Sequence, residues 1–154
     1  MENRSLQIRK MKEADIPAVE SIEQKSFSDF WSRDTLEEAL EIFPDTNFIA
    51  ESQEGIAGYI ICGVEDTGED IYGHICSLAV SPFHRGSGIG SALVQRAEYQ
   101  VMLKGATAMQ LEVRISNQPA QKFYKKLGYE PVFQYAGYYA NTEDAIVMMR
   151  WFRY

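Results

Sequence analysis

Apolar and polar positions follow two different periods along the chain, and these periods separate expected strands from expected helices. Alternation, or a short apolar run between turn residues, predicts strands at residues 6–11, 47–51, 56–64, 71–80, 108–113, 130–135 and 145–152. Apolar residues at helical spacing predict helices at residues 16–25, 33–41, 88–104 and 119–127. This order predicts an α+β fold with a mixed, mostly antiparallel sheet and about four helices, in one domain over residues 1–154.

Residues that favour helix N-termini stand where the helical patterns begin. Asp15 is expected to cap the first helix, with Pro17 tolerated in its first turn. Ser32 is expected to cap the second helix, and Trp31 and Leu36 have the spacing of a hydrophobic staple across its start. The third helix has an apolar face made of Ile89, Leu93, Ala97 and Val101.

Composition and charge narrow the classes of partner. The chain is 45% hydrophobic and 24% charged, which is typical of globular domains. Its net charge of −7 disfavours nucleic acid as a main partner and favours a cationic substrate. No apolar run approaches the roughly 20 residues of a membrane span, so no membrane association is expected. Residues 1–4 lack the apolar stretch of a secretory signal, so we expect a cytoplasmic protein.

The two cysteines, Cys62 and Cys76, lie in apolar strand-like runs and form no CxxC pair. We expect buried structural thiols in a reducing compartment. A hairpin centred near Gly68 would let the two face each other, which makes a disulfide geometrically conceivable. With two histidines and no Cys/His cluster, the sequence predicts no metal site.

A glycine-rich turn follows the apolar run that ends at Ser81, and a helical pattern follows the turn. Free N–H groups and the positive end of the helix dipole make such a turn a ready anion site. Gly86, Gly88 and Gly90 let the backbone approach phosphate oxygens closely. The Lys of a Walker loop is missing, and the glycine spacing is wrong for a dinucleotide fingerprint. An ordinary turn at a helix start stays open.

The segment Arg85-x-x-Gly88-x-Gly90 resembles the turn that holds the pyrophosphate of coenzyme A in the GNAT acyltransferase superfamily. Residues 111–129 resemble a second motif of that superfamily: a strand, Asn117, a helix carrying Tyr124, and then Leu-Gly-Tyr. The resemblance implies the GNAT fold, a seven-stranded twisted sheet with helices on its faces and two splayed central strands.

Within the superfamily, Leu-Glu-Val-Arg-x-Ser-Asn at residues 111–117 resembles RimI-type and archaeal or eukaryotic protein N-terminal acetyltransferases. Phe-x-x-x-Trp-Ser at residues 27–32 and Gly-Tyr-Tyr at residues 137–139 resemble the same enzymes. Residues 74–80 resemble the archaeal branch, and the whole resemblance runs over residues 6–150. It implies acetyl transfer from acetyl-CoA to the α-amine of a protein or peptide N-terminus, without a metal.

By this resemblance, the donor's pantetheine arm pairs with the backbone of Leu78, Ala79 and Val80 in the gap between the splayed strands. Arg85 either pairs with a phosphate or is an ordinary solvated arginine. The pyrophosphate would receive the backbone N–H groups of Gly86, Ser87, Gly88, Ile89, Gly90 and Ser91.

Two residues of the second motif have both a structural and a functional interpretation. Asn117 can cap the following helix, and by resemblance it binds the pantetheine arm. Tyr124 can be a core aromatic, and by resemblance its hydroxyl protonates the departing thiolate.

Glu112 and His74 are the candidates for base assistance, through one shared relay. Glu112 sits in an otherwise apolar strand, where a carboxylate is costly unless it faces a cleft. Its alternative is a surface ion pair with Arg114 or another cation, and the alternative for His74 is a satisfied core or edge histidine.

The peptide channel is expected from two aromatic-rich loops, although aromatics there can also be ordinary packing. Related eukaryotic enzymes place a glutamate in the first loop, and residues 28–30 contain none, so the preferred N-terminal residue stays open. The expected channel residues are Phe27, Asp29, Trp31, Tyr138 and Tyr139.

Other functions remain open at this stage. The enzyme can instead acetylate a small amine or a lysine, or the chain can be a non-catalytic acyl-CoA-binding domain. An α-amine, with a pKa of about 7.7–8.0, is neutral far more often at pH 7 than lysine, with a pKa of about 10.4. The expected partners are protein N-termini, including ribosomal proteins or nascent chains, and an auxiliary subunit or a second copy is conceivable.

Overall fold

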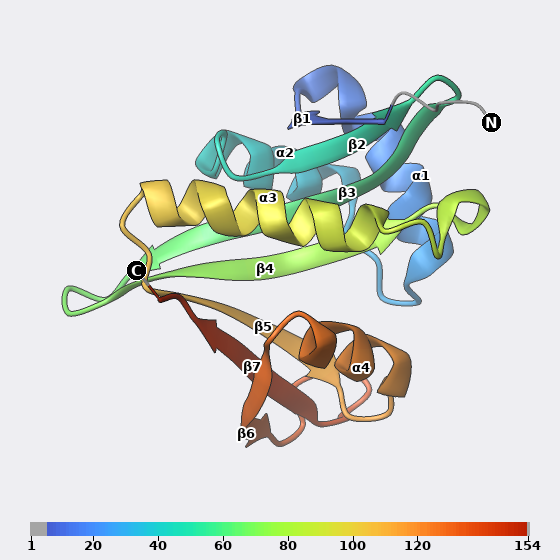
Figure 1. Cartoon of the computed structure of the whole chain (residues 1–154). Helices are drawn as coiled ribbons and strands as arrows, with labels where there is room; N and C mark the ends of the chain where they lie inside the picture. Colours follow the sequence, from blue (N-terminus) through green and yellow to red (C-terminus); the bar gives the residue numbers. More distant parts are fainter. Residues whose placement is uncertain (1–5, 154) are drawn as a thin grey trace.

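A computed structural model describes residues 6–153, and Figure 1 shows one twisted sheet with helices against its faces. Residues 1–4, from which we expect no secretory signal, lie outside the described residues. The sheet has seven strands in the order β1-β2-β3-β4-β5-β7-β6. The strands are β1 (Gln7–Lys10), β2 (Phe48–Ser52), β3 (Gly55–Asp66), β4 (Ile71–Val80), β5 (Ala108–Arg114), β6 (Glu130–Tyr135) and β7 (Ala145–Trp151). The expected fold class is confirmed, because only β4 and β5 pair in parallel among these strands.

The helices form two groups that cover opposite faces of the sheet. Consecutive residues of β3 show this arrangement, since Ile60 packs with the α3 cluster and Ile61 packs with the α1 and α2 cluster. All four residues expected on the apolar face of the third helix are buried. The helices are α1 (Ile16–Ser26), α2 (Arg33–Ile42), α3 (Ile89–Leu103) and α4 (Gln118–Lys126), with short 3₁₀ turns at Glu13–Asp15 and Pro82–His84.

One expected helix cap is confirmed and one is wrong. Ser32 Oγ accepts from the backbone N–H of Thr35 at 3.2 Å, at the start of α2. Asp15 stands at the expected N-cap position, just before α1, but its carboxylate makes no capping hydrogen bond to that helix. It accepts instead from the backbone N–H of Lys12 at 2.8 Å and from both terminal nitrogens of Arg9 at 2.8 and 2.9 Å. The charge-assisted, bidentate contact with Arg9 competes successfully with the helix start.

The cysteines are not partners. The hairpin around Gly68 exists, but the register shifts beside Cys62, which therefore stands opposite Ile75 and not opposite Cys76. Cys62 packs on the α3 face and Cys76 on the α1 and α2 face, so the two thiols point to opposite sides of the sheet. Both are free, and burial raises the pKa of Cys76 to about 11.

Two further observations concern residues 6–153. No helix in this part of the chain is long and apolar enough to cross a membrane. No group of three or more His, Cys, Asp or Glu side chains there is arranged to hold a metal ion.

Candidate active site

The two central strands separate partway along their length. β4 and β5 pair from Tyr72 opposite Ala108 to Ile75 opposite Leu111, and no pairing follows, although β4 continues to Val80. Figure 1 shows the two arrows diverging, with α4, β6 and β7 forming a lower lobe beyond the gap. The expected splay of the central strands is therefore present. It leaves backbone groups of both strands unpaired along a common opening.

A cavity of about 330 Å³ fills this opening. Both strands contribute to it after the point where they separate, and α1, α4 and two loops close its sides. The lining residues are Ile75, Cys76, Ser77 and Leu78 from β4; Leu111, Glu112, Val113 and Arg114 from β5; Asn117, Ala120, Phe123 and Tyr124 at α4; and Glu23, Phe27, Asp29, Trp31 and Tyr139. Of the three residues expected to bind the pantetheine arm, only Leu78 lines the cavity, while Ala79 and Val80 lie farther along β4.

The glycine turn has the backbone expected of an anion site. Gly86 and Gly88 have φ of 81° and 84°, values that side-chain-bearing residues rarely adopt. The first helical bond of α3 runs from Ala92 to Gly88, so the N–H groups just before Ala92 have no helical partner. Arg85 is exposed, and its Nε donates to the carbonyl of Val80 at 3.1 Å, so its role toward a phosphate stays a prediction.

Two residues of the second motif, Asn117 and Tyr124, both line the cavity. Asn117 caps α4, because its Oδ1 accepts from the N–H of Ala120 at 3.1 Å, and it also lines the cavity. Tyr124 is 8% exposed and packs edge-on between Phe123 and Tyr129, with ring centroids 5.0 and 5.6 Å away. Within residues 6–153 its hydroxyl makes no hydrogen bond. Burial raises the pKa of Tyr124, so the hydroxyl keeps its proton and can donate it.

Glu112 and His74 are in direct contact. His74 Nε2 lies 2.7 Å from Glu112 Oε1, and His74 Nδ1 lies 2.6 Å from Glu65. Burial alone would raise the pKa of Glu112, but the hydrogen bond and charge of His74 outweigh it, and the pKa is lowered. Burial lowers the pKa of His74, but the two carboxylates outweigh it, and the pKa is raised. The lowered pKa indicates an ionised Glu112 at the cavity, while His74 is not part of the lining and contacts Glu112 from outside it.

The alternative ion pair between Glu112 and Arg114 is absent. The second hydrogen bond of Glu112 comes from Gln110 Nε2, at 3.2 Å. Arg114 instead pairs with Asp29 and Glu143. The two side chains share a strand face but have other partners: Glu112 bonds to His74 and Gln110, and Arg114 bonds to residues of two loops.

Four of the five expected channel residues line the cavity: Phe27, Asp29, Trp31 and Tyr139. Tyr138 is outside the lining, but its ring centroid lies 5.0 Å from that of Tyr139. Burial and the charge of Glu112 both raise the pKa of Tyr138, so it stands near that carboxylate. The loops that carry these residues therefore border one mouth.

The sequence profile of the Acetyltransferase (GNAT) family matches residues 16–129, which is most of the chain. The chain belongs to the GNAT family. It is an N-acetyltransferase of the GNAT type.

Proteins of similar sequence or structure match this GNAT enzyme over most of its length. A putative ribosomal protein bS18-alanine N-acetyltransferase of Bacillus subtilis is 36% identical over 92% of this chain and 92% of its own. An N-alpha-acetyltransferase of Sulfurisphaera tokodaii is 37% identical over 72% of each chain. A chain of the NatC complex, solved with Gag peptide and CoA, superposes with a TM-score of 0.88 at 21% identity, over 96% of this chain and 99% of that chain.

One GNAT-site residue was not expected from the sequence. Glu23 is 2% exposed and lines the cavity, and its carboxylate accepts from Tyr59 Oη, from Ser77 Oγ at 2.8 Å and from the N–H of Trp31 at 2.9 Å. The signal was available, because Glu23 continues the spacing of the buried residues Ile16 and Val19 on α1. A carboxylate on the core-facing stripe of a helix needs hydrogen-bond partners, and here it ties α1 to two strands and a loop.

Proposed function

We propose that this GNAT enzyme transfers an acetyl group from acetyl-CoA to the α-amine of a protein or peptide N-terminus. The observation that carries the proposal is the gap between β4 and β5, where Glu112, Tyr124 and Asn117 line one cavity. The names of two relatives support it, one an N-alpha-acetyltransferase and the other an alanine N-acetyltransferase for a ribosomal protein.

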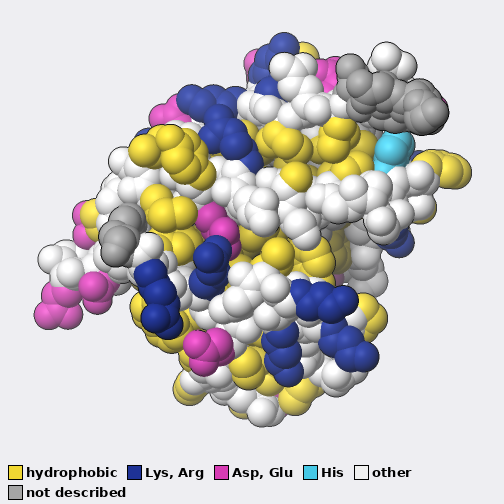
Figure 2. Space-filling model, viewed as in Figure 1, with side chains coloured by type: hydrophobic (Ala, Val, Ile, Leu, Met, Phe, Trp, Pro, Cys, Tyr) yellow, Lys and Arg dark blue, Asp and Glu magenta, His cyan; other side chains and the backbone are white. Residues whose placement is uncertain are grey.

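The donor side of the site fits acetyl-CoA, which supplies a thioester-activated acetyl group when bound. Beyond Ile75, β4 offers unpaired peptide groups to an extended arm. The start of α3 offers N–H groups to a pyrophosphate. Figure 2 shows Lys and Arg side chains gathered over the lobe that contains α4. Lys122, Lys125 and Lys126 are all exposed there and add positive charge beside the expected phosphates.

The acceptor side supplies the proton transfers. The amine nitrogen bonds to the acetyl carbon, and the bond between that carbon and sulfur breaks. Glu112, ionised at neutral pH, takes the proton that the amine loses, directly or through one water. Tyr124, protonated because burial raises its pKa, gives a proton to the departing sulfur.

An α-amine suits this site better than a lysine. Its pKa of about 7.7–8.0 leaves a useful neutral fraction at pH 7, whereas lysine, at about 10.4, needs a strong base. The lowered pKa of Glu112 makes it a weak base, which is adequate only for the more acidic amine. Protein N-termini, including those of ribosomal proteins and nascent chains in the cytoplasm, are therefore the proposed acceptors.

The test is an acetylation assay with acetyl-CoA and one peptide that carries a free N-terminus and an internal lysine. Fragment masses should place the acetyl group on the α-amine. The matched control is the same peptide with its N-terminus blocked, which should remain unmodified. Acetyl transfer mainly to the lysine, or only to small amines, would reject the proposal.

A further inference from the structure

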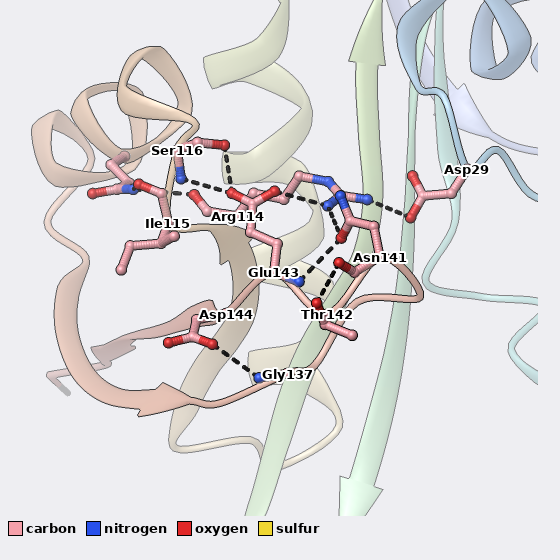
Figure 3. Close-up of polar contacts among 10 residues, drawn as sticks. Asp29, Arg114, Ile115, Ser116, Gly137, Asn141, Thr142, Glu143 and Asp144 are labelled. Atoms are coloured by element: carbon pink, nitrogen blue, oxygen red, sulfur yellow. Dashed lines mark hydrogen bonds and ion pairs between the residues drawn. The ribbon is translucent and has the colours of Figure 1, made fainter.

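Arg114, the last residue of β5, contacts both loops that border the cavity mouth (Figure 3). Its Nη1 donates to Asn141 Oδ1 at 3.1 Å and to Glu143 Oε1 at 3.0 Å, and its Nη2 donates to Asp29 Oδ2 at 2.7 Å. The guanidinium also lies 4.0 Å over the centre of the Tyr139 ring. The ring shields one face of the cation from water, which strengthens its ion pairs.

The contacts of Arg114 connect segments that are far apart in the sequence. Residues 27–32 join α1 to α2 and carry Phe27 and Trp31, while residues 136–144 join β6 to β7 and carry Tyr139. Across residues 6–153, no hydrogen bond or ion pair runs directly from one of these loops to the other. Arg114 is the only described residue that donates to both.

The two loops depend on Arg114 to different degrees. Glu143 has a second anchor, because its Oε2 accepts from the N–H of Ser116 at 3.0 Å and also from the Ser116 hydroxyl. Asp144 accepts from the N–H of Gly137 at 2.9 Å and stiffens the same loop (Figure 3). Among residues 6–153, Arg114 is the one hydrogen-bond partner of Asp29. Within residues 27–32, the N–H groups of Phe27 and Trp31 are also held by Glu23. Loss of the guanidinium should therefore release the stretch around Asp29, between these two anchors, more than residues 136–144.

We propose that Arg114 is a positioning residue that fastens the α1–α2 loop to the β6–β7 loop, so that the acceptor polypeptide meets a preformed mouth. This proposal rests on the proposed function, in which the two loops receive the acceptor. A mouth held in place needs no ordering when the acceptor binds, which favours affinity for the acceptor. The donor is proposed to bind at α4 and the start of α3, which Arg114 does not contact, so its binding should not respond.

An arginine is required for this role. Its planar guanidinium places donors toward two loops at once and stacks on Tyr139, whereas a lysine ammonium is a compact charge on a flexible stem. Arg114→Lys keeps the charge but should lose the link, so it separates positioning from simple electrostatics. Arg150→Lys is the matched control, because Arg150 pairs with Glu98 at 2.6 Å and does not line the cavity.

The first experiment is amide hydrogen exchange on the enzyme without substrates, and it does not depend on acetyl transfer. Arg114→Lys should speed exchange in residues 27–32 about tenfold, with a smaller change in residues 136–144. Arg150→Lys should leave both loops as in the wild type. Unchanged exchange in residues 27–32 of Arg114→Lys would overturn the proposal.

The second experiment measures KM and kcat with the peptide of the acetylation assay. Arg114→Lys should raise KM for the peptide about tenfold and change KM for acetyl-CoA and kcat less than about twofold. Asp29→Asn should raise KM for the peptide similarly, and the double variant should add little, since both changes remove one contact. A fall in kcat with both KM values unchanged would overturn the proposal. If the wild type modifies no peptide N-terminus, the proposed function fails, while the exchange result still decides whether Arg114 links the loops.

Discussion

The charge of Glu112 depends on a histidine that is itself outside the cavity. His74 stands between Glu65 and Glu112, and the two carboxylates raise its pKa. The positively charged His74 in turn lowers the pKa of Glu112, against the effect of burial. His74 therefore acts first on the state of the carboxylate, and a proton passed between them belongs to the pair.

We expect Glu112→Gln to lower kcat/KM about 10²-fold at pH 7, at the small end of the range for general-base catalysis. The loss should shrink as pH approaches 9, because the α-amine, with a pKa of about 7.7–8.0, then loses its proton unaided. A pH–rate series on one peptide measures this. Combining Glu112→Gln with His74→Ala should cost less than the product of the single losses, since both act on one relay. Multiplicative losses that are independent of pH would contradict the relay.

His74→Gln should destabilise the protein more in mild acid than in base. Because the folded state raises the pKa of His74, its contribution is complete below the unfolded value of about 6.5 and is lost as pH rises through the folded pKa. The lowered pKa of Glu112 sets the other limit, since that contribution is lost as pH falls through its folded pKa. We expect His74→Gln to lower the free energy of unfolding by about 1–2 kcal/mol at pH 6 and by less at pH 9. This loss is smaller than that for breaking a fully buried ion pair.

Urea unfolding at the two pH values checks this prediction. His84→Gln is the control. His84 has a single, longer ion pair of 3.5 Å, with the exposed Glu54, and it contacts neither Glu65 nor Glu112. A loss for His74→Gln that is equal at pH 6 and pH 9 would mean that size and packing matter there, and charge does not.

Tyr124→Phe should lower kcat with little change in acetyl-CoA affinity or stability. The hydroxyl makes no hydrogen bond in the described structure, so the folded state loses little when it is removed. It becomes important when negative charge develops on sulfur. The control is Tyr129→Phe, which loses a 2.6 Å bond to buried Glu98 and should reduce stability by about 1–3 kcal/mol. Unchanged turnover in Tyr124→Phe would make Tyr124 a packing residue.

At the level of elements, the glycine turn offers a matched pair of substitutions. Gly88 and Gly68 have φ of 84° and 87°, and a Cβ at either would meet no atom within 4 Å. Valine should therefore strain both positions similarly, by about 1–3 kcal/mol. Only Gly88→Val should abolish acetyl-CoA binding, because its side chain blocks the approach of phosphate to the turn. Titration calorimetry decides the matter, and undiminished affinity in Gly88→Val would place the pyrophosphate elsewhere.

The bounds of the helices and strands could be predicted from the sequence because they depend on local periodicity. β4 has the expected limits, and β3 exceeds the expected 56–64 by one residue at its start and two at its end. The disulfide geometry could not be predicted, because a single register shift beside Cys62 reverses which residues face each other. The carboxylate of Asp15 bonds to Arg9 of β1 and to the N–H of Lys12 instead of to the start of α1, and the helix pattern alone does not decide between these partners.

The candidate site was predictable only in part, for a related reason. Motif spacing identified Glu112, Tyr124 and Asn117, since each stands at a fixed place in a strand or helix. Glu23 was missed although it lies on the buried stripe of α1, because its hydrogen-bond partners Tyr59, Ser77 and Trp31 come from other segments of the chain. The link made by Arg114 joins three segments, and no pattern within one segment contains it.

At the scale of the whole molecule, charge is separated between the two ends of the site. The cavity lining carries three carboxylates, Glu23, Asp29 and Glu112, against one cation, Arg114. The chain as a whole has a net charge of −7. The exposed lysines of α4 lie on the donor side, where phosphates are expected. This distribution favours a cationic acceptor and an anionic donor at the same time.

Acceptors with basic residues after the N-terminus should therefore be modified faster than acidic ones. We expect kcat/KM for a peptide with lysines at positions 4 and 5 to exceed that of the matched glutamate peptide about tenfold at low ionic strength, through electrostatic steering. A glutamine peptide should lie between them. The ratio should fall towards one in 0.5 M salt, where screening acts over less than the roughly 8 Å of physiological salt. Initial rates for the three peptides at two salt concentrations measure the effect. A preference that persists in high salt would indicate direct contact with the lysines, and a preference for the acidic peptide would mean that Arg114 releases Asp29 to bind the acceptor.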